Sequence, residues 1–224
     1  MILPFYPGCD DLFRLSQFNI VEILIRAVVV LLAISVHETA HGYAAYKLGD
    51  PTAKSMGRLS LNPLKHIDPI GALCMLLFGF GWAKPVMINP YYFKKPKRDT
   101  AITGLAGPVS NFIMAFISIL ILQLLFRFHI PLNAFTRIIQ TFLIQFTLLN
   151  IGLGVFNLIP IPPLDGSKVF LSLLPNRLYN DIMRYEQFGW IILVVALGLG
   201  VLDPIIGTIG NWIVAAMQFL VSWI

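Results

Sequence analysis

Long runs of apolar residues are the feature of this 224-residue chain that most constrains its fold. A membrane hydrocarbon core about 30 Å thick takes about 20 consecutive apolar residues per helix, and several runs approach or exceed that length. Because 57% of all residues are hydrophobic and only 12% are charged, we expect lipid rather than water around most of the surface. The runs lie at residues 20–46, 67–82, 101–126, 138–159, 188–202 and 205–223.

These runs predict an all-α polytopic membrane protein, a bundle of about five or six transmembrane helices. We expect a single transmembrane domain over residues 1–224, with a core at about 20–166 and C-terminal helices at about 186–223. The run at 67–82 is short and broken by glycines, so it predicts either a thin span or a re-entrant segment. Asp203 and Pro204 divide the last apolar block, which leaves one kinked helix or two short helices as alternatives.

Two proline-rich stretches interrupt the apolar pattern. Residues 83–99 carry three prolines and five basic residues; the start of this stretch predicts an extended strand near the cytoplasmic membrane surface, and no regular helix is expected around the prolines. Residues 156–166 read FNLIPIPPLDG, so the preceding span should break or unwind there. The opening stretch has Asp10 and Asp11 and lacks a basic start, so we expect no removable signal peptide.

The distribution of basic residues predicts the orientation of the spans. Nine of the sixteen Lys and Arg lie between residues 47 and 98, and three more lie between 168 and 184. Such clusters beside apolar segments mark the cytoplasmic side of a cell membrane, so the net charge of +5 does not indicate nucleic-acid binding. On this multi-pass topology, the span beginning near Ile20 reaches the cytoplasmic side near His41, and the span beginning near Ile138 returns to that side near Asp165. Two distant segments should therefore meet at one membrane depth.

The segment His37-Glu38-Thr39-Ala40-His41 has the pattern H-E-x-x-H. Residues four apart on an α-helix share one face, so both imidazoles can bind one metal ion. Neutral imidazole suits zinc, and Glu38 can reach a water molecule beside the metal rather than the metal itself. Ionisable groups within a span cost at least about 3 kcal/mol each, which favours a metal site over two buried histidines bonded to their neighbours. Cys9 and Cys74 form no C-x-x-C pair and indicate no thiolate site.

A catalytic zinc usually takes three protein ligands and keeps one position open. Asp165 is the best candidate for the third, because it follows an apolar run and precedes Gly166, where an unwound backbone would let the carboxylate turn inward. A carboxylate in a surface turn is the alternative interpretation of Asp165. His66 is the rival ligand, although it lies beside Lys65 and Asp68 in loop sequence.

Together these residues resemble the site-2 protease family of intramembrane zinc metalloproteases. The resemblance covers most of the chain, and GRLSLNPLKHIDPIG and WAKPVMINP are similar to the compact branch without PDZ or CBS domains. Ser167 departs from the pattern, since many members have a second glycine there; zinc binding should survive this change. The motifs are HETAH at 37–41, AGPVSN at 106–111 and FNLIPIPPLDG at 156–166.

The resemblance implies one zinc per chain, held by His37, His41 and Asp165, with Glu38 activating water. It also implies that Asn111 lies close to the scissile carbonyl. From its sequence position alone, Asn111 would instead make a helix-packing hydrogen bond, and Asn157 carries the same ambiguity.

The implied activity is that of an endopeptidase that hydrolyses peptide bonds in or near transmembrane segments of membrane proteins. Its expected partners are a transmembrane substrate and membrane lipid, with no nucleic acid, and the oligomeric state is left open. We hypothesise that residues 47–65 and 84–89 bind an extended substrate segment by edge pairing.

Two other classes of function fit part of the pattern. A non-catalytic metal-binding membrane protein, such as a divalent-cation transporter, would need no Glu38 and would usually show repeated halves, which are not visible here. A silent scaffold that binds a partner's transmembrane helix would have no reason to keep the general base.

Overall fold

Four of the apolar runs form helices long and apolar enough to cross a membrane in the computed structural model, which describes residues 20–68, 84–131 and 133–223. The described residues contain no β-strand, so the prediction of an all-α polytopic protein is confirmed. Most of the run at 67–82 lies outside the described residues. The long helices are α1 (Ile20–Lys47), α4 (Pro96–Arg127), α5 (Ala134–Asn157) and α9 (Leu202–Val221). Shorter helices are α2 (Thr52–Ser55), η1 (Pro63–Lys65), η2 (Pro90–Tyr92), α6 (Asp165–Leu171), α7 (Asn176–Arg184) and α8 (Glu186–Gly198).

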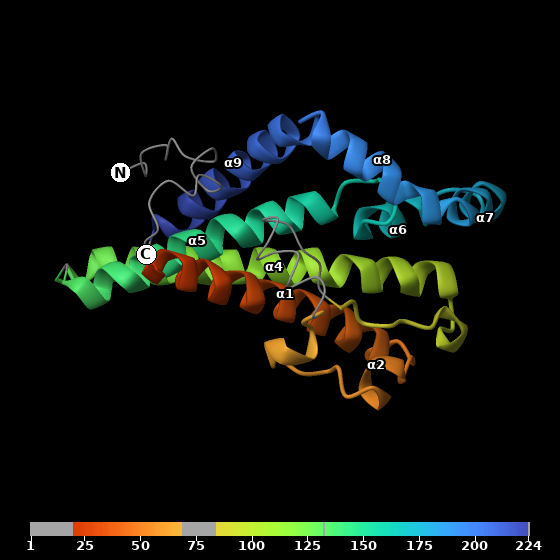
Figure 1. Ribbon diagram of the computed structural model, residues 1–224, viewed down its shortest axis with the longest axis horizontal. Helices are drawn as coiled ribbons and strands as arrows, with labels where there is room; N and C mark the ends of the chain where they lie inside the picture. The colour runs from red at the N-terminus through yellow and green to blue at the C-terminus, as the bar shows by residue number, and fades with distance from the viewer. Residues whose placement is uncertain (1–19, 69–83, 132, 224) are drawn as a thin grey trace.

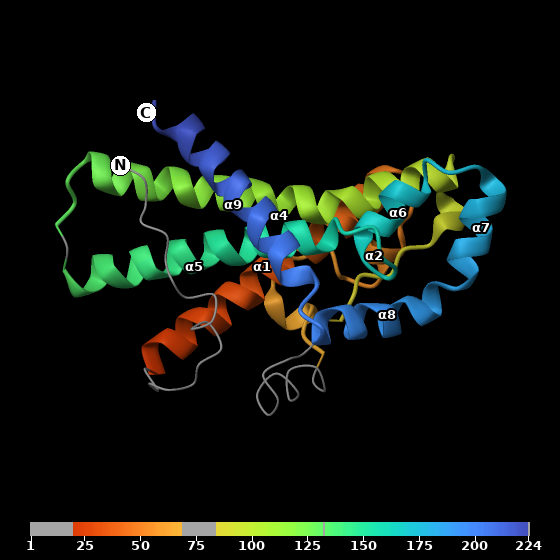
Figure 2. The same cartoon turned by 90° about the horizontal axis from the view of Figure 1, so that it is seen from above.

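Helices α1, α4 and α5 pack against one another and form the centre of the bundle (Figure 1). Val29 and Ala33 of α1 are buried with Phe146 of α5, and Ala115 of α4 is buried with Ile151 of α5. Helix α9 crosses over α5 and also contacts α4, as Figure 2 shows from above. Small residues at these contacts allow the helices to approach closely, which is how helices associate where lipid replaces water.

The helix ends correct one sequence prediction. We expected no regular helix around the prolines of residues 83–99, but α4 begins at Pro96. Proline is tolerated in the first turn, where its missing N–H would have no partner in the helix. The carboxylate of Asp99, fully buried, accepts the backbone N–H of Lys95 at 2.9 Å and so caps this end of α4. Helix α5 ends at Asn157, before Pro160, as predicted.

The last apolar block forms two helices rather than one kinked helix. Helix α8 ends at Gly198 and α9 begins at Leu202. Gly200 lies between them with a φ of +66°, a conformation that glycine adopts without a steric penalty. Pro204 lies in the first turn of α9, where a proline does not interrupt helical hydrogen bonding. The break between α8 and α9 therefore falls a few residues before Asp203 and Pro204.

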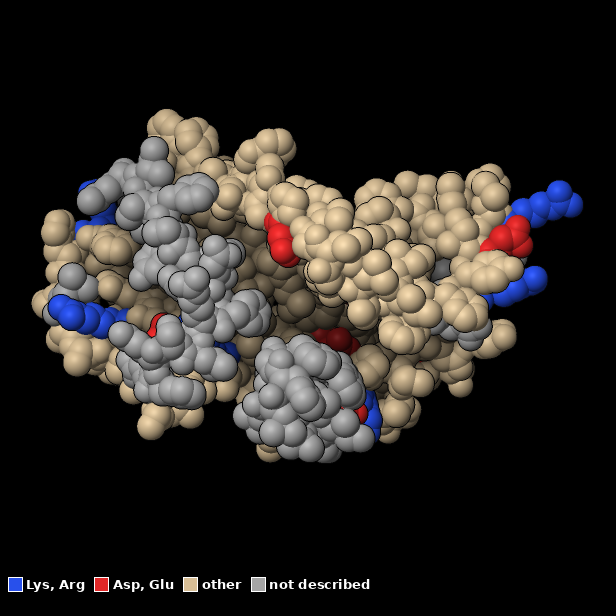
Figure 3. All heavy atoms as spheres, turned by 45° about the horizontal axis from the view of Figure 1, so that its top comes forward, with Lys and Arg blue, Asp and Glu red and all other residues tan. Residues whose placement is uncertain are grey.

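The surface of the helices suits a lipid environment. Large apolar side chains such as Trp190, Ile192 and Trp212 are more than half exposed. In Figure 3, residues other than Lys, Arg, Asp and Glu make up most of the described part of the face shown, and several of the basic side chains lie toward the two ends of its long axis. A chain of this kind satisfies its backbone polar groups within helices and presents apolar side chains outward, so the protein is a multi-pass membrane protein.

Candidate metal centre

Helix α1 brings two histidines to one face near its C-terminal end. His37 and His41 are 6% and 5% exposed, and their Nε2 atoms lie 3.0 Å apart. The Nδ1–H of His41 donates to the carbonyl of Thr103 on α4 at 2.7 Å. Because that bond uses the Nδ1 proton, the Nε2 atom of His41 is left with a lone pair directed toward His37. The bond to the Thr103 carbonyl thus orients His41 so that Nε2 can bind a metal ion.

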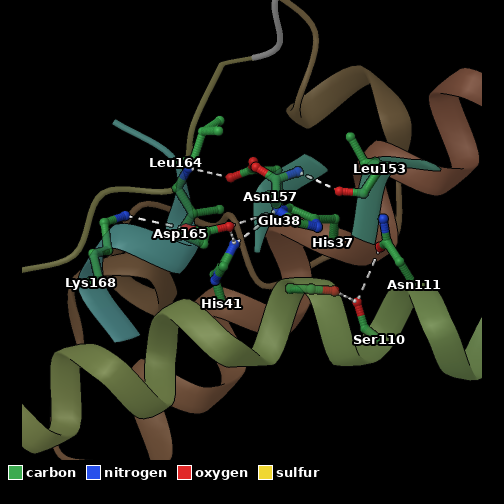
Figure 4. Close-up of polar contacts among 12 residues, drawn as sticks. His37, Glu38, His41, Ser110, Asn111, Leu153, Asn157, Leu164, Asp165 and Lys168 are labelled. Atoms are coloured by element: carbon green, nitrogen blue, oxygen red, sulfur yellow. Dashed lines mark hydrogen bonds and ion pairs between the residues drawn. The ribbon is translucent and has the colours of Figure 1, made fainter. Parts of the chain in front are cut away.

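The third ligand comes from the first residue of α6. Asp165 is 7% exposed, and its Oδ2 lies 3.2 Å from His37 Nε2 and 3.0 Å from His41 Nε2. Figure 4 shows the three side chains pointing toward one another from α1 and α6. We expected an unwound backbone at Asp165; instead the chain leaves α5, turns through the proline-rich segment and starts α6 at this residue.

These three atoms suit a tetrahedral zinc better than a hydrogen-bonded cluster. Ligands about 2.1 Å from a zinc ion lie about 3.4 Å apart in a tetrahedron, close to the separations seen here. Because the Nδ1–H of His41 is used by Thr103, at most one proton, on His37 Nε2, lies among these three atoms at 3.0 to 3.2 Å, so a cation fits the gap between them. Within the described part of the chain, His37, His41 and Asp165 form the cluster of His, Cys, Asp or Glu side chains whose ligand atoms lie close enough to hold one metal ion.

Helix α4 closes the third side of the centre through Gly107. A Cβ at this position would collide with Nε2 of His41 and would lie 2.6 Å from Cε1 of His37. Only a residue without a side chain therefore lets α4 pack directly against both ligands. Gly107 belongs to the AGPVSN motif, but this packing role is not evident from the sequence.

The other oxygen of Asp165 has its own partner. Oδ1 lies 3.3 Å from Nζ of Lys168, three residues later on α6. Burial alone raises the pKa of the Asp165 carboxyl, but the adjacent imidazoles of His37 and His41 and the charge of Lys168 hold it well below its usual range. Asp165 is therefore a carboxylate at neutral pH, with one oxygen toward the histidines and one toward Lys168. This ion pair was not predicted from the sequence, although residues three apart on a helix are neighbours and Lys168 follows Asp165 at that spacing.

Glu38 follows His37 on α1 and is partly buried. Its Oε2 accepts a hydrogen bond from the backbone N–H of Val86 at 2.8 Å. The segment that contains Val86, from Lys84 to Asn89, is neither helix nor strand, so the strand predicted there is not formed; its last residue, Asn89, has an extended backbone. Glu38 is thus tied to a segment almost fifty residues away, which no local pattern could reveal.

The two asparagines and His66 have different environments. Asn111 is fully buried, and its Nδ2 has no hydrogen-bond partner in the described residues. The amide of Asn157 donates to the Leu153 carbonyl at 3.0 Å, within its own helix. His66 Nε2 lies 2.7 Å from the Ser60 carbonyl and is not part of the ligand cluster, which argues against its role as the rival third ligand.

Comparison with known proteins gives a consistent set of relatives. The family model described as Peptidase family M50 matches residues 128–199. YwhC of Bacillus subtilis (strain 168), provisionally named a zinc metalloprotease, is 41% identical over 83% of this chain and 84% of that protein. Rip2 of Mycolicibacterium smegmatis, which carries the same provisional name, is 31% identical over 75% of this chain and 64% of its own length. No solved structure matches the chain.

Proposed function

Since this chain belongs to peptidase family M50, we propose that His37, His41 and Asp165 hold its zinc and that Glu38 is its general base. The protein is a membrane-embedded zinc metalloprotease that acts on peptide bonds. The observation that carries the residue assignment is the approach of two imidazole nitrogens and one carboxylate oxygen to within 3.2 Å at a buried contact between α1 and α6.

The reaction follows from the chemistry of this donor set. His37, His41 and Asp165 would hold the zinc, which would supply Lewis-acid polarisation of a peptide carbonyl and a water molecule with its pKa lowered to about 7. Glu38 would accept a proton from the attacking water and pass it to the leaving amine. Lys168 keeps Oδ1 of Asp165 occupied, which leaves Oδ2 directed at the histidines.

Asn111 is the second polar group that we assign to the reaction. It lies one helical turn after Gly107, the residue that contacts both histidines, and its Nδ2 is buried with no partner among the described residues. A buried donor without a partner carries a desolvation cost, which a substrate carbonyl would offset. The position supports a role in binding the scissile carbonyl or the oxyanion that develops from it.

We assign the substrates to membrane proteins whose cleavage sites lie in or near transmembrane segments. A helix satisfies its own carbonyls, so the substrate must unwind locally before one of them can reach the zinc, and glycine or proline near the cleavage site should help. The segment 84–89 lies beside Glu38 and offers a backbone edge for pairing with an unwound strand. The basic loops predict that this end of the bundle faces the cytoplasm of a cell membrane. Residues 20–166 would form the catalytic core, with the C-terminal helices packed on it.

The test is cleavage of a set of transmembrane-helix substrates in detergent by the wild type and by Glu38→Gln, with the zinc content of each measured. We expect the wild type to cleave with one zinc per chain, and the variant to lose at least about 100-fold in rate while keeping its zinc. A variant that cleaves as well as the wild type would overturn the assignment of Glu38. A wild type that binds zinc and cleaves no substrate in the set would favour a silent scaffold.

A further inference from the structure

We infer that Arg58 is a positioning residue for the general base: it fixes the segment Lys84–Asn89 so that the N–H of Val86 orients the Glu38 carboxylate. The inference rests on the proposed role of Glu38. It gives a role to the hydrogen bond between the Val86 N–H and the Glu38 carboxylate. The proton transfer described above leaves this hydrogen bond without a role.

The segment is anchored at its first end by Arg58. This residue is 8% exposed, and its Nη1 donates to the carbonyls of Lys84 and Pro85 at 3.3 and 3.0 Å. Among the described residues Arg58 has no carboxylate partner, so these carbonyls carry the hydrogen bonds of a buried cation. The N–H of Lys84 is also held, by the carbonyl of His66 at 2.8 Å. The backbone immediately before Val86 is therefore fixed from two directions.

The other end is anchored by Asp50. Its carboxylate is fully buried, and Oδ2 accepts the backbone N–H of Asn89 at 2.7 Å. Oδ1 accepts the N–H of Thr52 at 2.9 Å, which holds Asp50 itself in place at the start of α2. Hydrogen bonds to an ionised carboxylate are stronger than neutral ones, so this anchor is firm.

Val86 lies between the anchors and against α1. Its side chain is 6% exposed, and a Cβ at Gly42 on α1 would lie 3.2 Å from Val86 Cγ1 and 2.8 Å from Leu59 Cδ2. The close packing of α1 on this segment brings the Val86 N–H to 2.8 Å from Oε2 of Glu38. Rotation about the last torsion of a glutamate is only weakly restricted, so this bond selects one orientation of the carboxylate. One oxygen is held by the backbone, and the other is left to accept the proton.

The arrangement acts on the chemical step rather than on metal binding. None of the contacts of Arg58, Asp50 or Val86 involves the three proposed ligands. Loss of the Val86 bond should therefore lower kcat while zinc stays bound. Loss of a neighbouring backbone donor, which could pair with substrate, should raise KM instead.

Proline substitution tests the bond directly, because proline removes the backbone N–H. We expect Val86→Pro to lower kcat about tenfold, with KM and zinc content close to wild type. Met87→Pro is the matched control: its N–H has no partner among the described residues, and we expect it to change KM rather than kcat. Equal kcat in Val86→Pro and wild type, or equal losses of kcat in both variants, would overturn the inference.

Arg58 gives an independent test that leaves the backbone of the segment unchanged. Arg58→Met should lower kcat about tenfold with zinc retained, and Arg58→Lys, which can still donate to one carbonyl, should recover part of the loss. Loss of zinc in Arg58→Met, or no recovery in Arg58→Lys, would assign Arg58 to folding alone. Glu38→Gln belongs in the same series: an active Glu38→Gln refutes the proposed function, whereas an inactive Glu38→Gln beside a fully active Arg58→Met refutes only the role of Arg58.

Discussion

The two arms of the metal centre are built in different ways. His37 and His41 lie on one helix, so their spacing follows from helical geometry alone. Asp165 reaches the same point through the end of α5, a proline-rich turn and the start of α6, 128 residues away from His37. The spacing of the first arm needs only that α1 forms; the second arm needs the whole bundle to pack correctly. The comparison predicts that substitutions can damage the arms separately, and that α4, which contacts both, is where they fail together.

The largest effect should follow removal of a histidine. His41→Ala deletes a proposed ligand whose orientation the Thr103 carbonyl already fixes, so we expect zinc affinity to fall at least about 1000-fold and cleavage to disappear. Competition with a chelator measures the affinity. His129→Ala, an exposed histidine beyond the other end of α4, is the control and should bind zinc normally. Wild-type zinc affinity in His41→Ala would remove the first arm from the account.

Gly107→Ala should break both arms at once. The added methyl group would collide with His41 and press on His37, so α4 must move away from the centre. We expect cleavage to fall about 100-fold, with zinc bound more weakly. Gly152→Ala is the matched control, because a Cβ there meets nothing within 4 Å and alanine favours helix. Equal activity in the two variants would show that α4 does not pack on the histidines as described.

Gly166→Ala should damage the second arm alone. Its Cβ would collide with the Leu158 carbonyl and lie 2.7 Å from that of Ile159, so the start of α6 must shift with Asp165. We expect zinc affinity to fall about 30-fold, while the histidine pair stays in place. Cobalt substitution would report the change, because the visible spectrum depends on ligand number. Gly207→Ala, at an open position on α9, is the control. A cobalt spectrum identical to the wild type would contradict the separation of the arms.

Lys168→Met should give the smallest effect. It removes a cation 3.3 Å from Oδ1 of Asp165 but leaves both ligand arms in position. We expect zinc affinity to fall about fivefold, since the second oxygen of Asp165 is then free to turn toward the metal. Lys168→Arg should restore most of the affinity, because it keeps the charge. Equal zinc affinities in Lys168→Met and Lys168→Arg would show that Lys168 does not orient Asp165.

The same contrast explains how much of the site could be predicted from sequence. The histidine pair was predictable because a period of 3.6 residues relates positions on one helix, and the meeting with Asp165 followed from charge clusters that set the direction of two spans. The bond between Val86 and Glu38 and the anchors at Arg58 and Asp50 were not, because packing between loops and α1 sets them. The burial of His66 against Ser60 was missed for the same reason.

The fold divides along similar lines. Apolar runs located the long helices, because span length follows from bilayer thickness. The start of α4 at Pro96 and the break at Gly200 depended on capping by Asp99 and on one glycine conformation, which hydropathy does not report. The length of the apolar runs thus predicts where the long helices lie. Their ends depend on local hydrogen bonds and backbone conformation.

The most direct test of the central claim is the zinc-to-protein ratio of Asp165→Ala measured beside that of Glu38→Gln, with cleavage assayed in the same samples. Both variants should be inactive. The account predicts that Glu38→Gln retains one zinc per chain through a chelator wash and that Asp165→Ala loses it, because Asp165 is assigned as a ligand and Glu38 is not. Retention of zinc by Asp165→Ala at wild-type affinity would contradict the account, since the second arm of the metal centre would then not exist.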